Sequence, residues 1–224
     1  MHEVISDLDR PERSIVESFS GLPSAIISDV TSKYENTMSS AIKPVWEVPE
    51  VAGTALTVKT YPGDNLMIHK AVTMAKPGDV LVIDANGYTE AGLMGELLAR
   101  SCQAQEINGS VVDGAVRDVE DVSEIEFPMY ARGVSPKGSY KGHPGSINVP
   151  VSCGGLEVHP GDIIVGDREG VAKVSPDHAE EVLEAAKAKL EAESELRERA
   201  ENGEYIYQVA GHDEVYEELD IKER

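Results

Sequence analysis

The chain has 224 residues, of which 41% are hydrophobic, and this is enough for one well-packed core. Its 41 Asp and Glu residues against 20 Lys and Arg give a formal net charge of −21, which repels phosphate backbones, so we expect no nucleic-acid partner. No apolar run approaches the roughly 18 residues that a membrane-spanning helix needs, and the first residues show no signal-peptide pattern, so we expect a cytoplasmic protein with no membrane partner.

The first third of the sequence predicts two short helices, a strand and a third helix. Residues 11–19 and 22–30 show helical patterns. Residues 51–60 alternate apolar and small polar side chains, which is typical of a strand. A helix is expected over residues 63–75, with Asp64 as its cap.

A turn of the same composition precedes two apolar runs. Pro77-Gly78-Asp79 leads into residues 80–84, and Pro160-Gly161-Asp162 leads into residues 163–167. We interpret both as tight turns into buried strands rather than as ligand loops, because Pro and Gly supply the backbone angles of such turns.

Strands are therefore predicted near residues 80–84, 110–116, 147–151 and 163–173, with helices between some of them. Strands that alternate with helices imply a layered α/β domain.

A long helix is expected over residues 175–200 near the C-terminus. Val182, Ala186 and Leu190 mark its apolar stripe, and the same spacing places Glu193 on that face. A lone carboxylate needs a partner or a metal to justify burial, and the sequence alone favours a solvated position for Glu193 at the edge of the stripe.

Several common sites are not expected. The six histidines lack paired metal spacing, so zinc is not predicted. Residues 138–145 are rich in glycine but lack the Gly-Lys-Ser/Thr ending of a P-loop, and we interpret them as a flexible loop near the mouth of the site. Cys102 and Cys153 are too few for a disulfide framework and are expected to be buried free thiols.

The most informative pattern is an acid that folding brings beside an Arg-Asp pair. A helix is predicted from Gly95 to Ile107 and a returning strand over residues 110–116. Both elements are about 18 to 23 Å long, so Glu96 and Arg117-Asp118 are expected at one end. Each residue alone has a structural explanation, but together they offer a clamp for a carboxylate, a metal ligand and a proton carrier.

The blocks around these residues resemble those of one protein family. They are Tyr61-Pro62-Gly63-Asp64-Asn65-Leu66, Lys76 to Asp84, Gly95-Glu96-Leu97-Leu98-Ala99, Val111 to Asp118, Phe127 to Gly133, Cys153-Gly154-Gly155 and His159 to Asp167. In composition and order they resemble the RraA-like family, which includes the 4-hydroxy-4-methyl-2-oxoglutarate aldolases.

This resemblance extends from about Gly21 to Gly203 and implies a swivelling β/β/α fold. We expect a single domain with helical terminal segments. Residues 1–20 would form the N-terminal helical segment, residues 21–175 the RraA-like domain, and residues 176–224 a C-terminal helix and acidic tail packed on the same domain.

Family members differ in activity. Some are divalent-metal aldolases that cleave 4-hydroxy-2-oxo acids to pyruvate and also decarboxylate oxaloacetate, and others inhibit a ribonuclease by binding it. The aldolase signature is an acid, twenty residues and then Arg-Asp, which this chain matches from Glu96 to Arg117. Glu96 stands where Asp is usual, whereas the inhibitor branch lacks this acid. The resemblance therefore favours a lyase, with a protein-binding regulator as the alternative.

The resemblance also implies a metal site. Asp118 would hold Mg²⁺ or Mn²⁺, and Glu193 would reach the metal region of a neighbouring subunit. Such shared sites imply a homo-oligomer, either a trimer or a hexamer.

Roles in substrate binding and catalysis follow for the remaining residues of the pattern. Arg117 would clamp the 2-oxo acid and stabilise the enolate. The helix start at Gly95, Leu97 and Leu98 would bind the substrate carboxylate through backbone N–H groups. Glu96 would move protons.

Four substrates fit this chemistry: 4-hydroxy-4-methyl-2-oxoglutarate, 4-carboxy-4-hydroxy-2-oxoadipate, oxaloacetate and a sugar-derived 2-oxo acid.

The excess of acidic residues is spread along the chain. This suits concentrated salt, because salt screens the repulsion between like charges, and we hypothesise a salt-adapted host.

Overall fold

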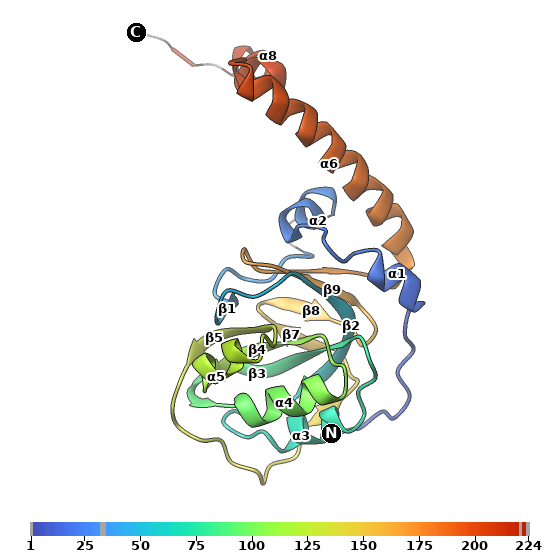
Figure 1. The fold of residues 1–224 in the computed structure, drawn as a ribbon, viewed down its shortest axis with the longest axis vertical. Coiled ribbons are helices and arrows are strands. Elements are labelled where there is room, and N and C mark those ends of the chain that lie inside the picture. Colours follow the sequence, from blue (N-terminus) through green and yellow to red (C-terminus); the bar gives the residue numbers. More distant parts are fainter. Residues whose placement is uncertain (1, 32–34, 220, 223–224) are drawn as a thin grey trace. The chain divides into compact units, whose positions relative to one another are not determined.

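The computed structural model describes residues 2–31, 35–219 and 221–222. The chain forms two compact units, residues 1–183 and residues 184–224. The first unit contains the sheets, and the second is helical (Figure 1).

A mixed sheet organises the first unit. Its strands lie in the order β1-β5-β4-β3-β2-β9-β10, with β6 paired to β2. Strands β2 to β5 run parallel, whereas β1, β6, β9 and β10 pair antiparallel with their neighbours. The strand bounds are Lys43–Pro44 (β1), Val51–Lys59 (β2), Asp79–Gly92 (β3), Gly109–Val116 (β4), Met129–Val134 (β5), Ser146–Ile147 (β6), Ile163–Gly166 (β9) and Val171–Val174 (β10).

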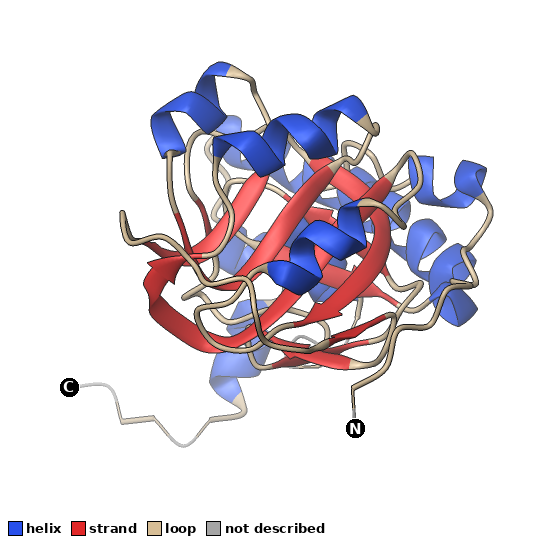
Figure 2. Cartoon of the chain, turned by 90° about the horizontal axis from the view of Figure 1, so that it is seen from below, coloured by secondary structure: helices blue, strands red, loops and turns tan. Residues whose placement is uncertain are grey.

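Helices cover one face of this sheet and a β-hairpin covers the other. Helices α3 (Leu66–Val72), α4 (Glu96–Ala104) and α5 (Val119–Glu124) share an apolar core with the strands. Figure 2 shows helices lying across one face of the sheet. The second core packs the hairpin of β7 (Val151–Cys153) and β8 (Leu156–Val158) against the opposite face. Strand β4 is buried along its whole length, because the helices cover one face of the sheet and the hairpin covers the other. The predicted β/β/α fold is confirmed.

Helices α1 (Arg13–Glu17) and α2 (Ser24–Val30) also belong to this unit, which confirms the two short N-terminal helices. Cys102 and Cys153 are both buried free thiols, as predicted. Burial raises the pKa of Cys102 to about 12.

Several element boundaries differ from the prediction. Strand β3 ends at Gly92 rather than at residue 84, and α3 covers Leu66–Val72 rather than residues 63–75. The segment 163–173 is a hairpin of β9 and β10 rather than one strand, and the segment 147–151 contributes to two strands, β6 and β7. Helix α4 ends at Ala104, because Glu106 adopts a positive φ of 56° and the Ile107 N–H returns to the carbonyl of Cys102 at 3.0 Å.

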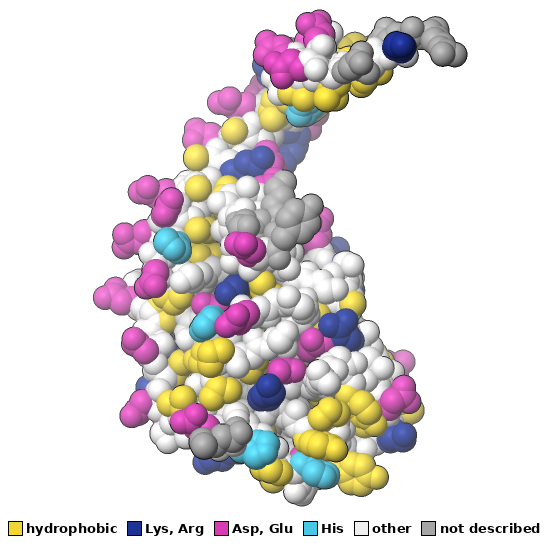
Figure 3. Space-filling view, turned by 180° about the vertical axis from the view of Figure 1, so that it is seen from behind, with side chains coloured by type: hydrophobic (Ala, Val, Ile, Leu, Met, Phe, Trp, Pro, Cys, Tyr) yellow, Lys and Arg dark blue, Asp and Glu magenta, His cyan; other side chains and the backbone are white. Residues whose placement is uncertain are grey.

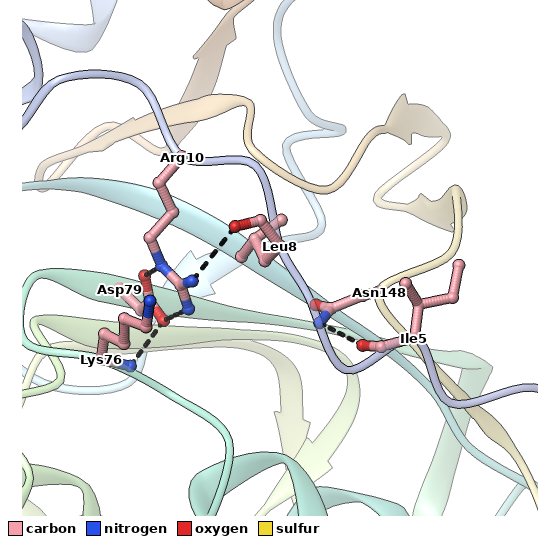
Figure 4. Close-up of polar contacts among 6 residues, drawn as sticks. All are labelled: Ile5, Leu8, Arg10, Lys76, Asp79 and Asn148. Carbon is pink, nitrogen blue, oxygen red and sulfur yellow. Dashed lines mark hydrogen bonds and ion pairs between the residues drawn. The ribbon is translucent and has the colours of Figure 1, made fainter.

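An N-terminal strap, residues 3–11, crosses the first unit (Figure 4). The guanidinium of Arg10 donates to both carboxylate oxygens of Asp79, at 2.9 and 2.7 Å. Asn148 donates to the carbonyl of Ile5 at 2.8 Å, and Val4 forms a parallel bridge with Ile147. Segments distant in sequence are thus joined by backbone pairing and one buried ion pair.

The second unit contains most of a long helix. A 3₁₀ turn at Pro176–His178 precedes α6 (Ala179–Glu201), so the predicted C-terminal helix is confirmed. Helices α7 (Ile206–Val209) and α8 (His212–Glu217) follow. Among the described residues, no helix is long and apolar enough to span a membrane.

Candidate active site

The end of strand β4 lies beside the start of helix α4. The Leu93 N–H donates to the carbonyl of Ala115 at 2.8 Å, and the Arg117 N–H donates to the carbonyl of Met94 at 2.9 Å. Because β3 and β4 are parallel, their carboxyl ends meet at the same edge of the sheet. Ligands in open parallel sheets bind at this edge.

These contacts bring residues 96, 117 and 118 together, as the sequence pattern predicted. The Glu96 N–H points to Asp118 Oδ2 at 3.4 Å, and Arg117 Nε lies 3.2 Å from the same oxygen. Asp118 has a left-handed backbone with φ of 55°, a conformation that Asp tolerates better than most residues. Its carboxylate thus faces both a helix start and a guanidinium.

Gly95 makes this close approach available. A Cβ atom at residue 95 would collide with Asp118 Oδ2 and lie 3.0 Å from Arg117 Cγ. Gly92 is similar, since a Cβ there would lie 2.9 Å from Arg117 Cβ. Absence of a side chain at both positions therefore leaves room for the Arg-Asp pair.

A cavity of about 240 Å³ opens over this pair. This volume suits a small metabolite, because sites for drug-sized ligands start near roughly 300 Å³. The cavity is lined by Asn65, His69, Gly92, Leu93, Gly95, Leu97, Leu98, Arg117, Asp118, Gly138, Ser139 and Lys141.

Five of the residues predicted for the site line this cavity, namely Gly95, Leu97, Leu98, Arg117 and Asp118.

The other two predicted residues lie elsewhere. Glu96 begins α4, but its carboxylate pairs with Arg100 one turn along the helix. Glu193 belongs to the second unit, where it lies 3.5 Å from Lys189 Nζ. Neither carboxylate lines the cavity.

Two basic side chains that the sequence analysis did not assign also line the cavity. Lys141 comes from the glycine-rich loop that was expected at the mouth, and His69 comes from α3. Partial burial lowers the pKa of His69, and the nearby charge of Lys141 lowers it further. The charges of Arg117 and Lys141 make the cavity suited to an anion that has more than one charged end, and a neutral His69 can still donate a hydrogen bond to it.

Asn65 also lines the cavity. Its Nδ2 donates to the carbonyl of Leu93 at 2.8 Å, whereas its buried Oδ1 has no hydrogen-bond partner within the described part of the chain. Its position directly after Asp64 in the Tyr61 to Leu66 block was the available signal for it.

The residues present fit a hard divalent cation better than a closed zinc site. Asp118 is the one carboxylate among the described cavity residues, and no cluster of three or more His, Cys, Asp or Glu side chains suited to a metal occurs in residues 2–31, 35–219 and 221–222. Mg²⁺ is commonly held by one or two carboxylates, with waters and substrate oxygens completing its shell. Asp118 meets that minimum.

Fold and cavity together define an α/β protein with a cavity, lined by Arg117 and Lys141, at the carboxyl ends of parallel strands. The profile of the RraA-like family, described as Aldolase/RraA, matches residues 24–172, and the chain belongs to this family.

Relatives of the chain carry aldolase names. The chain is 41% identical over 193 residues to a protein of Halalkalibacterium halodurans named "Putative 4-hydroxy-4-methyl-2-oxoglutarate aldolase", covering 86% of this chain and 91% of that protein. It is 34% identical over 120 residues to the 4-hydroxy-4-methyl-2-oxoglutarate aldolase of Thermus thermophilus, covering 54% of this chain and 73% of that protein.

A solved structure carries a different name. The crystal structure of Streptomyces coelicolor RraAS2, described as an unusual member of the RNase ES inhibitor RraA protein family, superimposes with a TM-score of 0.78 at 27% identity. The superposition covers 85% of this chain and 99% of the RraAS2 chain.

Proposed function

We propose that this protein is a divalent-metal-dependent aldolase that cleaves a 4-hydroxy-2-oxo acid, such as 4-hydroxy-4-methyl-2-oxoglutarate, to pyruvate, and that it also decarboxylates oxaloacetate. The observation that carries the proposal is the Arg117-Asp118 pair beside the start of α4, in a small cavity that Lys141 and His69 also line. The aldolase names of the relatives support it.

The reaction sets clear demands on the site. A proton leaves the 4-hydroxyl group, the bond between C3 and C4 breaks, and its electron pair moves into the enolate of pyruvate. A proton then returns to C3. The enzyme must therefore bind two carboxylates, stabilise negative charge on the 2-oxo oxygen and carry one proton.

Arg117 and the start of α4 meet the first two demands in this proposal. The guanidinium of Arg117 would bind the oxygens of the 2-oxo acid and stabilise the charge that develops there. The N–H groups of Leu97 and Leu98 lie in the first helical turn, where backbone donors lack partners within the helix, and would bind the adjacent carboxylate.

Lys141 and His69 would serve the far end of the substrate. Both belong to segments other than α4 and β4, so a ligand held by Arg117 at one end can meet them at the other. A dicarboxylate then satisfies more of the basic groups than a monocarboxylate does.

Glu96 would carry the proton, through a water molecule. Its carboxylate pairs with Arg100, and the role requires it to turn toward the cavity. The extra methylene of Glu relative to Asp supplies reach for this movement.

Asp118 would hold Mg²⁺ or Mn²⁺, with Glu193 from a neighbouring subunit of a trimer or hexamer as a further ligand. Such an ion supplies Lewis-acid stabilisation of the negative charge on the 2-oxo oxygen.

The test is a screen for pyruvate release from the four candidate substrates in molar KCl, with Mg²⁺, Mn²⁺ or EDTA. We expect pyruvate release with either ion and loss of release with EDTA.

Arg117→Ala should lower kcat/KM by about 10³-fold with an unchanged circular dichroism spectrum, because the loss of one charge-stabilising donor has an effect of this size. Asp118→Ala should also abolish the response to metal. Wild-type release by either variant would refute the assignment.

The structural similarity to RraAS2 supports a second candidate, a regulator that binds a ribonuclease. The acidic surface would then engage a basic partner. A regulator would release no pyruvate from any of the four substrates and would lower the activity of a purified ribonuclease in proportion to its concentration.

A further inference from the structure

Three turns in the first unit share the sequence Pro-Gly-Asp, at residues 62–64, 77–79 and 160–162. Their glycines have φ of 79°, 90° and 93°, and in each the Asp N–H donates to the carbonyl before the proline, at 2.9, 3.1 and 3.1 Å. All three aspartates are buried, with exposures of 0%, 1% and 4%. The three segments therefore form the same kind of β-turn. Each has Pro at its second position and Gly, with a positive φ, at its third position.

Two of the aspartates close their own turns. Asp79 Oδ2 accepts from the Lys76 N–H at 2.8 Å, and Asp162 Oδ2 accepts from the His159 N–H at 2.9 Å. Each also pairs with one cation, Asp79 with Arg10 and Asp162 with Lys173. These contacts are sufficient to explain both carboxylates as structural.

Asp64 differs, because its carboxylate binds a distant loop. Asp64 Oδ2 accepts from the N–H groups of Gly142 and His143, at 2.7 and 3.0 Å, and lies 3.1 Å from His143 Nδ1. Its Oδ1 accepts from the Leu66 N–H at 2.9 Å. Burial alone would raise the pKa of Asp64, but these donors lower it below its usual value, so they hold the carboxylate ionised.

The loop held in this way carries Lys141, which lines the cavity. The backbone of Tyr140 pairs with the turn on both sides, since its N–H donates to Gly63 at 2.8 Å and its carbonyl accepts from Asn65 at 3.0 Å. His143 stacks on Tyr61 with ring centroids 4.2 Å apart. Lys141 therefore lies between two points at which the loop is fixed to the Asp64 turn.

We propose that Asp64 is a positioning residue, which holds the loop so that Lys141 faces the cavity and recognises the second carboxylate of a dicarboxylate substrate. The inference rests on the proposed function for the identity of the ligand. The position of Lys141 is independent of that function, and a separate measurement reports it.

The test compares Asp64→Asn with Asp162→Asn. In Asp64→Asn the new side-chain amide can still accept at its oxygen, but it presents N–H groups where Gly142 and His143 also donate, so the loop should be released. Asp162→Asn removes an equally buried carboxylate from the same kind of turn without touching this loop, and it controls for general loss of stability.

The first readout is the titration of His69, followed by NMR of its ring proton in the full-length protein. Because Lys141 lowers the pKa of His69, release of the loop should raise it in Asp64→Asn, as it should in Lys141→Met, while Asp162→Asn should match the wild type. An unchanged His69 titration in folded Asp64→Asn would overturn the proposal. This readout needs no activity, so it stands even if no substrate is cleaved.

The second readout is the KM for a dicarboxylate. We expect Asp64→Asn to raise KM by about tenfold and to change kcat by less than about threefold, as loss of one charge-assisted contact implies. Equal losses in Asp64→Asn and Asp162→Asn would show a structural role only and would overturn the proposal.

If Asp64→Asn does not fold, His143→Phe is the second variant. It removes the imidazole contact and keeps an aromatic ring over Tyr61, and we expect smaller rises in the His69 pKa and in KM.

Discussion

Gly95 shows how one missing side chain creates the site. A Cβ atom at residue 95 has no room, because Asp118 Oδ2 and the stem of Arg117 occupy the space where it would lie. Both neighbours are the charged groups assigned to catalysis. Pressure on them is therefore expected to affect turnover more than folding.

We predict that Gly95→Ala lowers kcat/KM by about 100-fold, since a displacement of about 1 Å at a reacting group has an effect of this size. Pyruvate release and the melting temperature are the measurements. Gly133→Ala is the matched control, because a Cβ there meets its nearest atom, Thr89 Cγ2, at 3.9 Å. Equal activity in the two variants would contradict the steric account.

At the scale of elements, α4 and β4 were predictable because each carries a local signal. The pattern of apolar residues identified the helix and the strand, and their matched lengths placed residue 96 beside Arg117 and Asp118. The return of β9 into β10 was missed, although the charged, glycine-ended segment Asp167 to Gly170 is a turn signal between two apolar runs.

The far side of the cavity was not predictable in the same way. His69 and Lys141 line the same cavity, and the loop that carries Lys141 binds the turn at Asp64 through Gly142, 78 residues further along the chain. No periodicity connects such segments. The sequence pattern therefore predicted the end of the cavity formed by α4 and β4. The end lined by His69 and Lys141 depends on tertiary contacts and could not be predicted.

The N-terminal strap is held in part by one ion pair, whose carboxylate is buried. The side chain of Arg10 is 18% exposed and that of Asp79 is 1% exposed. Removing one partner leaves a buried charge uncompensated, so we predict that Arg10→Met lowers the free energy of unfolding by about 3 kcal/mol, measured by urea denaturation.

Arg168→Met is the control for this change. Arg168 pairs with Glu47, but both side chains are 71% exposed, and such pairs contribute little. An equal and small effect of both substitutions would show that the strap is held by its backbone pairing rather than by Arg10.

At the scale of the whole molecule, net charge opposes folding. Acidic side chains are dispersed over the face of the first unit in Figure 3 and along the second unit, rather than gathered in one patch. With a net charge of −21, their mutual repulsion favours the expanded, unfolded chain. Salt shortens the screening length from about 30 Å at 0.01 M to about 3 Å at 1 M, so repulsion falls as salt rises.

We therefore predict that the melting temperature rises between dilute buffer and molar KCl. Most of a purely electrostatic gain should appear below about 0.2 M, where the screening length already falls below the spacing of distant charges. An isosmotic sucrose series is the control, because sucrose stabilises by exclusion from the surface without screening charge. A melting temperature that does not rise with KCl would remove the salt-adapted interpretation, and an equal rise in sucrose would assign the effect to exclusion rather than to charge.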